Sequence, residues 1–433
     1  MLRRLSLRTL APAILAIAPA LGCGYVHRFM PWHDHGGVAL RADGPRDNGP
    51  LREARDHLRE ERDHGDFSMD DALALSQAAR AFDEQSGWDK PPAAGRATLA
   101  DLPRRHWWYL FVAPRDWGKG ALAIDRDAAP GTYAAMIDAL EQLVIKAQPG
   151  APPLTADGYL ELHRLATRGV FDRSHGDAIA PDFAHAPNRY PVAAIHDLGS
   201  LHVEHLAQAL GELKAEGVAG WSSELQHDRS DDAPPAWLAK LLADHEDINP
   251  HSKPAKLIFQ RHGDEEWLVA TNAYDAHEAR KWAAQWLADY AAEIAKAPKR
   301  SASENLDLLA AQPPLDDFGM ALKPTAKPSE DLAGVIRPIA KLVRRMQVSH
   351  LFADRAEGVD TVLLLDLLLA QNGLPPSIVE DPTIFAGREP LDALVAEIVK
   401  GELRYQVLAR ELSARDNTAA PGANTPPAPA VVR

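Results

Sequence analysis

One histidine, one phenylalanine and one aspartate stand at alternate positions in the last third of the chain, at His350, Phe352 and Asp354. They belong to a polar loop that runs into a leucine-rich stretch at 363–369. The first backbone N–H groups of a helix lack intrahelical partners and the helix dipole favours negative charge there, so a loop that feeds a helix can bind phosphate. In such a loop a histidine can take a proton from an attacking hydroxyl, a carboxylate can hold Mg²⁺ against phosphate oxygens, and a phenylalanine can anchor the loop in the core.

The helix that follows this loop is predicted to lie in the middle of a helical bundle. Leucine fills six of the seven positions from 363 to 369, which leaves hardly any polar face. Asn372-Gly373 is typical of a left-handed helix end, and Pro375-Pro376 prevents the helix from continuing. A structural interpretation also stays open, in which the histidine caps a helix or lies in the core and the aspartate only interacts with the helix dipole.

The segment resembles the signature of the Fic, or Fido, superfamily, which reads His-x-Phe-x-Asp, then Gly-Asn-Gly-Arg or a variant, and then a buried helix. His350, Phe352 and Asp354 match the first part. The resemblance covers roughly residues 150 to 412 and implies a mainly α fold, a Fido-like helical bundle with one or two small β-hairpins. Three further segments are similar to family elements: the upstream helix at 332–350, the first helix at 159–170 and a hairpin at 256–272, which would be the flap that clamps a target protein.

The resemblance also implies roles for individual residues. His350 would be the catalytic base that deprotonates a target hydroxyl, and Asp354 would bind Mg²⁺. The remaining members of the predicted phosphate loop are Phe352, Arg355 and Gly358. The reaction implied is transfer of a phosphate-containing group to a hydroxyl of a protein.

The loop departs from the family pattern where the nucleotide phosphates would be held. Ala356 replaces the phosphate-binding Asn, Glu357 replaces a Gly, and Gly358 replaces the Arg, while Thr361 stands where many members have a second Arg. Each lost cation or donor removes roughly a few kcal/mol of charge compensation in a dry site, and Glu357 adds repulsion. These changes argue against nucleotide transfer, although Arg355 could compensate a smaller phosphate-bearing ligand.

The N-terminus predicts export. A basic start, "MLRRLSLR", precedes an apolar run too short to cross a bilayer comfortably, and Cys23 follows it at the end of "ALGC". This ending resembles the lipobox of bacterial lipoproteins, which implies that Cys23 is lipidated and attaches the chain to a membrane. Gly24 at the next position resembles proteins sorted to the outer membrane. We therefore expect an envelope lipoprotein that faces the periplasm, where ATP is essentially absent.

Composition separates the chain into regions and excludes one class of partner. The formal charge of −14 repels phosphate backbones, so nucleic-acid binding is not expected. The region after Cys23 is rich in Gly, Pro and His without apolar periodicity, and the C-terminus is rich in Pro and Ala. The predicted regions are a signal peptide at 1–22, a tether with a solvated helical segment at 23–66, an α+β extension at 67–150, the Fido-like helical domain at 151–412 and a disordered tail at 413–433.

Apolar periodicity predicts several elements that would position the loop. The β-prone runs at 105–114 and 120–127 suit a hairpin, and the runs at 256–272, joined by "HGDE", suit another. Ser68 is a candidate cap for a short helix. Amphipathic helices are predicted at 131–150, 154–171, 199–217, 275–297 and 329–348.

Histidines outside the loop suggest a further alternative. His196, Asp197, His202 and His205 lie close together in sequence and could share a metal ion, although their spacing matches no zinc-protease motif. Neither a Gly-x-Ser-x-Gly elbow nor a Walker or dinucleotide loop occurs. Three hypotheses follow: a degenerate Fic-type transferase with bound Mg²⁺, a non-catalytic binding protein that uses the hairpin and the old cleft, and a metal-dependent hydrolase.

Overall fold

The structure is a computed structural model, and it describes the chain between residues 49 and 419 with several gaps. Cys23, Asp197, Asp354 and Arg355 lie outside the described residues. The gaps are at 65–66, 87–101, 128, 147–151, 173–176, 180–181, 184–188, 197, 230–231, 273–274, 313–327 and 353–357.

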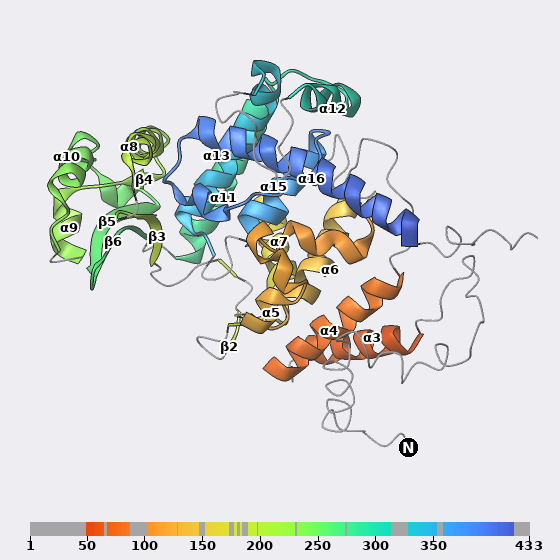
Figure 1. Cartoon of the computed structure of the whole chain (residues 1–433). Helices are drawn as coiled ribbons and strands as arrows, with labels where there is room; N and C mark the ends of the chain where they lie inside the picture. The colour runs from red at the N-terminus through yellow and green to blue at the C-terminus, as the bar shows by residue number, and fades with distance from the viewer. Residues whose placement is uncertain are drawn as a thin grey trace, which may run out of the picture.

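The described chain is mainly helical with a small sheet at one end, which confirms the predicted class (Figure 1). The five predicted amphipathic helices are all present, and Ser68 caps a sixth by accepting the Asp71 N–H at 3.2 Å. The longer helices are α3 (Gly49–His64), α4 (Met69–Ser86), α6 (Thr132–Lys146), α7 (Ala156–Thr167), α8 (Ser200–Ala215), α11 (Ala276–Ile294), α13 (Glu330–Ser349) and α16 (Leu391–Ala419). Shorter ones are α9 (Ser223–Arg229), α10 (Ala236–Asp244), η5 (Pro250–Ser252), α12 (Ala302–Ala310), the π-helix η6 (Val359–Leu364), α15 (Leu365–Gln371) and η7 (Pro382–Ala386).

The sheet contains the predicted hairpin and lies beside α8, α9 and α10 (Figure 1). Strands β5 (Ala255–His262) and β6 (Glu265–Thr271) pair antiparallel, and Gly263 takes a φ of 62° in the turn that joins them. Strand β3 (Arg189–Ala194) pairs with β6, and the short β4 (Ala219–Gly220) pairs parallel with β5, which gives the order β3-β6-β5-β4. A separate ladder joins β1 (Phe171–Asp172) to β2 (Asp177–Ala178).

The hairpin predicted at 105–114 and 120–127 is wrong, because this segment is helical. It forms the 3-10 helices η3 (Arg104–Leu110) and η4 (Pro114–Lys119) and the short helix α5 (Ala123–Asp127). Trp107 and Trp108 are adjacent and both buried, whereas adjacent side chains of a strand face opposite sides. The Trp107 ring N–H also donates to the Leu102 carbonyl at 2.8 Å. Burial of consecutive aromatic residues therefore overrides their β propensity.

Helix α3 is not the freely solvated helix that its mixed charges predicted. Leu58 is buried and α3 packs along α4, with the Arg55 guanidinium 4.0 Å from the centre of the Phe82 ring. The prediction failed because the aliphatic part of an arginine side chain can pack on an apolar surface while its guanidinium group pairs with a carboxylate.

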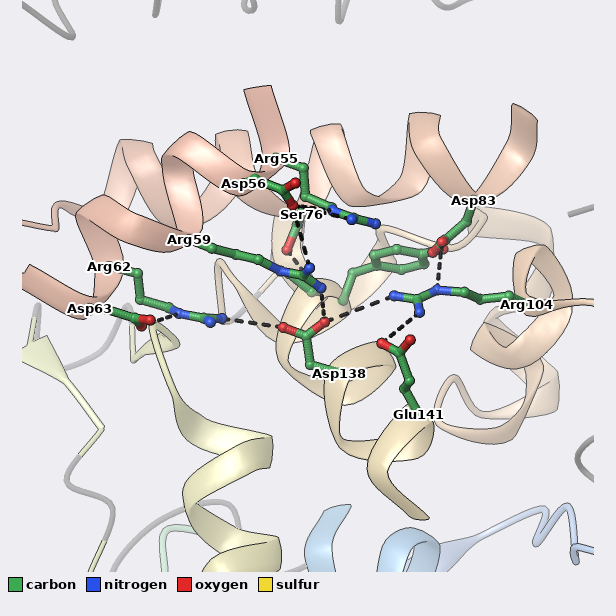
Figure 2. A network of polar contacts seen from close by, with 12 residues as sticks. Arg55, Asp56, Arg59, Arg62, Asp63, Ser76, Asp83, Arg104, Asp138 and Glu141 are labelled. Carbon is green, nitrogen blue, oxygen red and sulfur yellow. Dashed lines mark hydrogen bonds and ion pairs between the residues drawn. The ribbon is translucent and has the colours of Figure 1, made fainter. Parts of the chain in front are cut away.

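Carboxylates and arginines form a network between α3, α4, η3 and α6 (Figure 2). Asp138 of α6 pairs with Arg59, with Arg62 at 3.5 Å and with Arg104 at 3.9 Å. Arg104 also binds the buried Asp83, at 2.7 Å. Burial raises the pKa of Asp83 despite the opposing effect of Arg104, so the arginine is what allows a carboxylate to lie there. The network fixes the first two helices onto the rest of the described chain.

Helix α13 occupies the centre of the main helical region and contacts α11, α15, α16, η6 and η7. Its Arg344 is wholly buried and binds Glu212 of α8 at 2.5 Å and Glu216, the residue directly after α8, at 2.6 Å. Glu212 also accepts the N–H of Leu391, the first residue of α16, at 2.9 Å. One buried arginine thus holds the sheet-bearing part of the chain against the central helices.

The last helix extends beyond the predicted end of the helical domain. We expected a disordered tail from residue 413, but α16 continues to Ala419. Leu412 is buried, and the Ser413 hydroxyl donates to the Ala409 carbonyl one turn earlier, so the start of the predicted tail is attached to the helix. Residues 420–433 lie outside the described residues.

The substitution Asp138→Asn is expected to lower the free energy of unfolding by roughly 2 kcal/mol, because three arginines lose a partly buried charged partner. Urea unfolding followed by circular dichroism measures this loss. The control is Glu60→Gln, which neutralises an exposed acid on α3 and should change the unfolding free energy by less than about 0.5 kcal/mol. Equal effects of the two substitutions would show that the network does not stabilise the fold.

Candidate functional site

The leucine-rich helix lies in the interior, as predicted. We call η6 and α15 together the leucine rod; all six of its leucines between 363 and 369 are buried. Its end is the expected left-handed turn, in which Gly373 has a φ of 71° and the Leu374 N–H returns to the Leu369 carbonyl at 2.9 Å. Its beginning was not predicted: residues 359–364 form π-helix, in which each turn holds more residues than an α-turn.

His350 ends the preceding helix in a conformation that few residues adopt. It is the C-cap of α13, with φ 50° and ψ 57°, and it is the one non-glycine residue with positive φ in the described part of the chain. Its N–H donates to the Met346 carbonyl at 3.0 Å. Histidine enters the left-handed region more readily than most residues, yet the conformation still costs about 1 kcal/mol or more. The surrounding contacts must therefore fix His350.

Two of those contacts come from the sheet. The His350 ring stacks on the ring of Tyr190 in β3, with centroids 4.1 Å apart and an interplanar angle of 12°. The side-chain amide of Asn272, directly after β6, donates to the carbonyls of Ser349 and His350 at 3.2 and 3.1 Å. The base of the hairpin therefore meets the end of α13, so the structure brings together two segments that the sequence analysis had assigned to one site.

The environment of His350 makes its imidazole a weak base. Burial lowers its pKa to about 4, and the Gln347 carbonyl, 3.4 Å from Nδ1, opposes that shift only in part. The ring is consequently neutral at pH 7. It is able to accept a proton, but it holds one poorly.

Phe352 anchors the loop in the core and does not face a ligand. Its side chain is fully buried and stacks on His163 of α7 at 3.9 Å and on Phe183 at 5.3 Å. Its backbone forms an isolated bridge with Phe183, and the ring of Tyr159 lies 4.7 Å away. We call the contacts around His350 and Phe352 the junction; it unites α7, α13, the hairpin and the leucine rod.

The remaining predicted loop residues receive little support from the described geometry. Asp354 and Arg355 lie outside the described residues, so magnesium binding at Asp354 and phosphate binding at Arg355 stay predictions. Gly358 has helical angles, φ −65° and ψ −30°, and a Cβ placed there would meet nothing within 4 Å. Local packing therefore does not require glycine at 358. Cys23 also lies outside the described residues.

Buried acids are the main feature of this region that the sequence analysis missed. Asp360 accepts the Tyr159 hydroxyl at 2.5 Å, and Asp366 accepts the Ser377 N–H at 2.9 Å, each through Oδ1. Their Oδ2 atoms, and both carboxylate oxygens of Glu402 in α16, have no hydrogen-bond partner in the described structure. Burial raises the pKa of all three acids, that of Asp366 to about 8, and Asp366 raises the pKa of Glu402 further.

The histidines proposed as a metal site lie apart from the junction. His205 and His202 of α8 both approach Glu389, with Nδ1–Oε distances of 2.6 and 3.9 Å. His196 instead lies beside β6, where its Nδ1 accepts the Glu266 N–H at 3.3 Å and its ring meets Trp267 edge-on. Among the described residues no three His, Cys, Asp or Glu side chains are placed to hold a metal ion.

The hairpin's backbone edges are largely occupied. β6 is paired on both sides, by β3 and β5. On the outer edge of β5 the Gln226 side chain takes the Phe259 N–H at 2.9 Å and Asp232 takes the Arg261 N–H at 2.9 Å. A partner strand therefore has no free run of backbone groups along β5. Only the tip, Arg261–Glu265, is exposed along its whole length.

Comparison with known proteins leaves the family open. No protein-family model matches the chain, and no curated protein matches it. Within the described residues no helix has the length and apolar character needed to cross a membrane.

The buried acids predict a dependence of stability on pH. The folded-state pKa of Asp366, about 8, exceeds its ordinary 3.8, so the folded protein binds this proton more tightly than the unfolded chain. Its contribution to stability is present at low pH and is lost between roughly pH 4 and pH 8, by at most about 1.4 kcal/mol per pH unit. Asp366→Asn cannot ionise and should flatten this decline, raising the unfolding free energy at pH 7 by roughly 1 to 4 kcal/mol.

Urea unfolding from pH 5 to pH 9 measures the effect, and Asp244→Asn, which alters an exposed acid, is the control. An unchanged slope in Asp366→Asn would mean that Asp366 is ionised in the folded protein throughout this range.

The stacking of Tyr190 on His350 predicts a titration. Tyr190→Ala uncovers one face of the imidazole, so the pKa of His350 should rise from about 4 towards 6.5 as solvation is restored. The imidazole protons followed by NMR measure the pKa, with the His350 signals identified by their absence in His350→Gln. Tyr109→Ala removes a tyrosine that stacks on Trp108 instead and should leave His350 unchanged.

Proposed function

We propose that the chain is a Fido-like protein of the bacterial cell envelope that binds a partner protein and does not transfer a nucleotide. One observation carries the proposal: the ring predicted to be the catalytic base is packed flat on Tyr190 and has a pKa of about 4. In this proposal His350 and Phe352 keep the architecture of a group-transfer site while its chemistry is lost.

The low pKa has an energetic consequence for catalysis. A general base works best with a pKa near the operating pH. A pKa of about 4 lies 7 − 4 = 3 units below neutrality, so protonating His350 costs about 4 kcal/mol more than protonating a base of pKa 7. The substitutions at Ala356, Glu357 and Gly358 remove phosphate-binding groups in addition. Both effects disfavour transfer.

Recognition of the partner is proposed at the tip of the hairpin. The tip residues are exposed, and the backbone edge of β5 is taken by Gln226 and Asp232, so side chains rather than strand pairing would make the contact. Arg261 of the tip is paired with Glu266 at 2.6 Å, so Asp264 and Glu265 are the acidic groups that the tip offers, and the partly exposed Trp267 beyond the tip, next to His196, adds an aromatic surface. A basic segment of a protein fits this chemistry.

Transfer of a phosphate-containing group remains a second candidate because of the backbone at His350. Strained left-handed residues persist where the surrounding structure holds them, and they are concentrated at functional sites. In such a transferase His350 would deprotonate a protein hydroxyl. Asp354 would bind Mg²⁺, and the ion would bind the phosphate oxygens of the substrate. The described acid closest to Asp354 in sequence, Asp360, is buried and bound to Tyr159, so it cannot replace Asp354 as a ligand.

Envelope location is part of the proposal and comes from the N-terminal sequence. Export would follow from the signal peptide at 1–22, and attachment to the outer membrane, facing the periplasm, would follow from lipidation of Cys23. Palmitate labelling that persists in Cys23→Ser would contradict the attachment.

Two measurements separate binding from transfer. The purified chain is incubated with an envelope extract, Mg²⁺ and labelled ATP, GTP or UTP, beside His350→Ala and the control His251→Ala, which alters an exposed histidine. We expect no label that depends on His350. Label that disappears only in His350→Ala would establish transfer and overturn the proposal.

The binding arm uses a photo-crosslinking amino acid in place of Asp264 at the tip or, as a control, in place of the exposed Lys281 on α11. An adduct with an envelope protein is expected from position 264 and not from 281. The absence of any adduct at 264, or equal adducts at both positions, would remove the tip as the binding surface.

A further inference from the structure

Helix α10 turns an apolar side to the solvent at the edge of the sheet-bearing part of the chain (Figure 1). Its Leu238 and Leu242 are buried against the protein. Trp237, on another side of the same helix, is 39% exposed, and Ile248 in the loop that follows α10 is fully exposed. These are two of the four large apolar side chains that are exposed in the described part of the chain. Such residues need no explanation when they are scattered, but two within one short segment indicate a contact surface.

The helical repeat defines the exposed side of α10. Steps of three and four residues make four of its side chains neighbours on the helix surface: Trp237, Lys240, Leu241 and Asp244. Lys240 and Asp244 are exposed, and Leu241 is half-buried. Small side chains continue the surface on the Lys240 side, which allows a second helix to approach closely. We call this whole set the outer face; its small members, all exposed, are Ala236, Ala239 and Ala243.

The two charges of the outer face are complementary to a second copy of the same face. Lys240 and Asp244 form no ion pair in the described structure, although they lie one turn apart on the helix. Two α10 helices that pack antiparallel about a twofold axis bring Lys240 of each copy opposite Asp244 of the other, whereas a parallel pair would set like charges against each other. The chain carries a formal charge of −14 and repels its own copies, but the outer face is neutral. Two copies can therefore meet at this face.

We propose that the outer face of α10 is the interface of a weak, twofold-symmetric dimer of this chain. Lys240 and Asp244 would form two equivalent ion pairs across the axis, and Trp237 would lie against the far end of α10 of the second copy, where Ile248 is exposed. Helix α10 has nine residues and a length of about 14 Å, which is small for an interface. We therefore expect a dissociation constant between about 1 µM and about 1 mM. The dimer is independent of the function proposed for the junction and the hairpin tip.

Sedimentation equilibrium of the full chain tests the dimer, with Cys23→Ser present to prevent lipidation and to remove the only cysteine. Between about 1 µM and about 500 µM we expect a reversible equilibrium between monomer and dimer. Trp237→Glu should raise the dissociation constant at least about tenfold, because it puts an acid on the apolar surface of each copy. The matched control is Met69→Glu, which alters an equally exposed apolar side chain on α4 and should leave the dissociation constant unchanged. A chain that stays monomeric throughout, or equal dissociation constants for the two variants, would overturn the proposal.

Exchange of the two charges tests the antiparallel geometry. Lys240→Asp alone and Asp244→Lys alone each replace both attractive pairs with like-charge pairs, so each should raise the dissociation constant at least about fivefold. In the double variant opposite charges face each other again, and the dissociation constant should return to within about twofold of the original value. Both side chains are exposed, so the substitutions leave the core of the chain intact. A double variant that dimerises as weakly as the single variants would contradict the proposed interface.

Discussion

The need to bury the leucine rod governs the arrangement of the main helical region. A helix with apolar side chains on nearly every side is stable in water only when neighbours cover it all round. The covering elements come from distant parts of the sequence: α7 contacts the start of the rod, and α13, packed along it, binds α11 and α16 in turn (Figure 1). His350 and Phe352, which follow α13 directly, are fixed by the contacts of His350 with Tyr190 and of Phe352 with His163. The elements of the junction are thus brought together by the packing around the rod, whether or not the junction carries out any chemistry.

Polar groups within this apolar region have two different effects. Arg344 is buried against the carboxylates of Glu212 in α8 and Glu216 directly after it, which compensate its charge and join the sheet to the central helices. Asp366 and Glu402 have no such cation in the described part of the chain, so burial raises the pKa of both carboxyl groups, that of Asp366 to about 8. Burying them lowers stability, and an apolar pair of similar size would pack there at lower cost. The apolar burial of the rod's leucines must therefore offset the loss of stability that comes from burying these carboxyl groups beside them.

Much of the fold could be predicted from local signals, because those signals have local causes. Thr155, Asp275, Ser301 and Ser329 accept N–H groups of the helices they begin, and each stands just before an apolar stripe. Asn372-Gly373 ended the rod as expected, and "HGDE" turned the hairpin. Residues 105–127 were predicted wrongly because β propensity says nothing about which neighbours will bury two adjacent tryptophans.

The candidate site was predictable only in part. His350 and Phe352 could be identified by spacing, but Tyr190 and Asn272 lie in other elements and carry no motif of their own. The Asn305 amide donates to the Asn372 carbonyl at the end of the rod across 67 residues, and no short-range pattern encodes that contact. The sequence could not predict these contacts because they join residues that lie far apart along the chain.

The π-helical start of the rod gives this region an unusual sensitivity to chain length. One α-helical residue turns the chain by about 100°, and a π-turn accommodates one residue beyond the regular repeat. Deleting a single residue between 359 and 364 would restore a uniform α-helix and rotate Asp360, with the loop leading back to His350, by about a quarter of a turn relative to Asp366. A change of one residue in the length of this segment would thus rotate the first part of the rod, which binds Tyr159 through Asp360, relative to the second part, which binds Ser377 through Asp366.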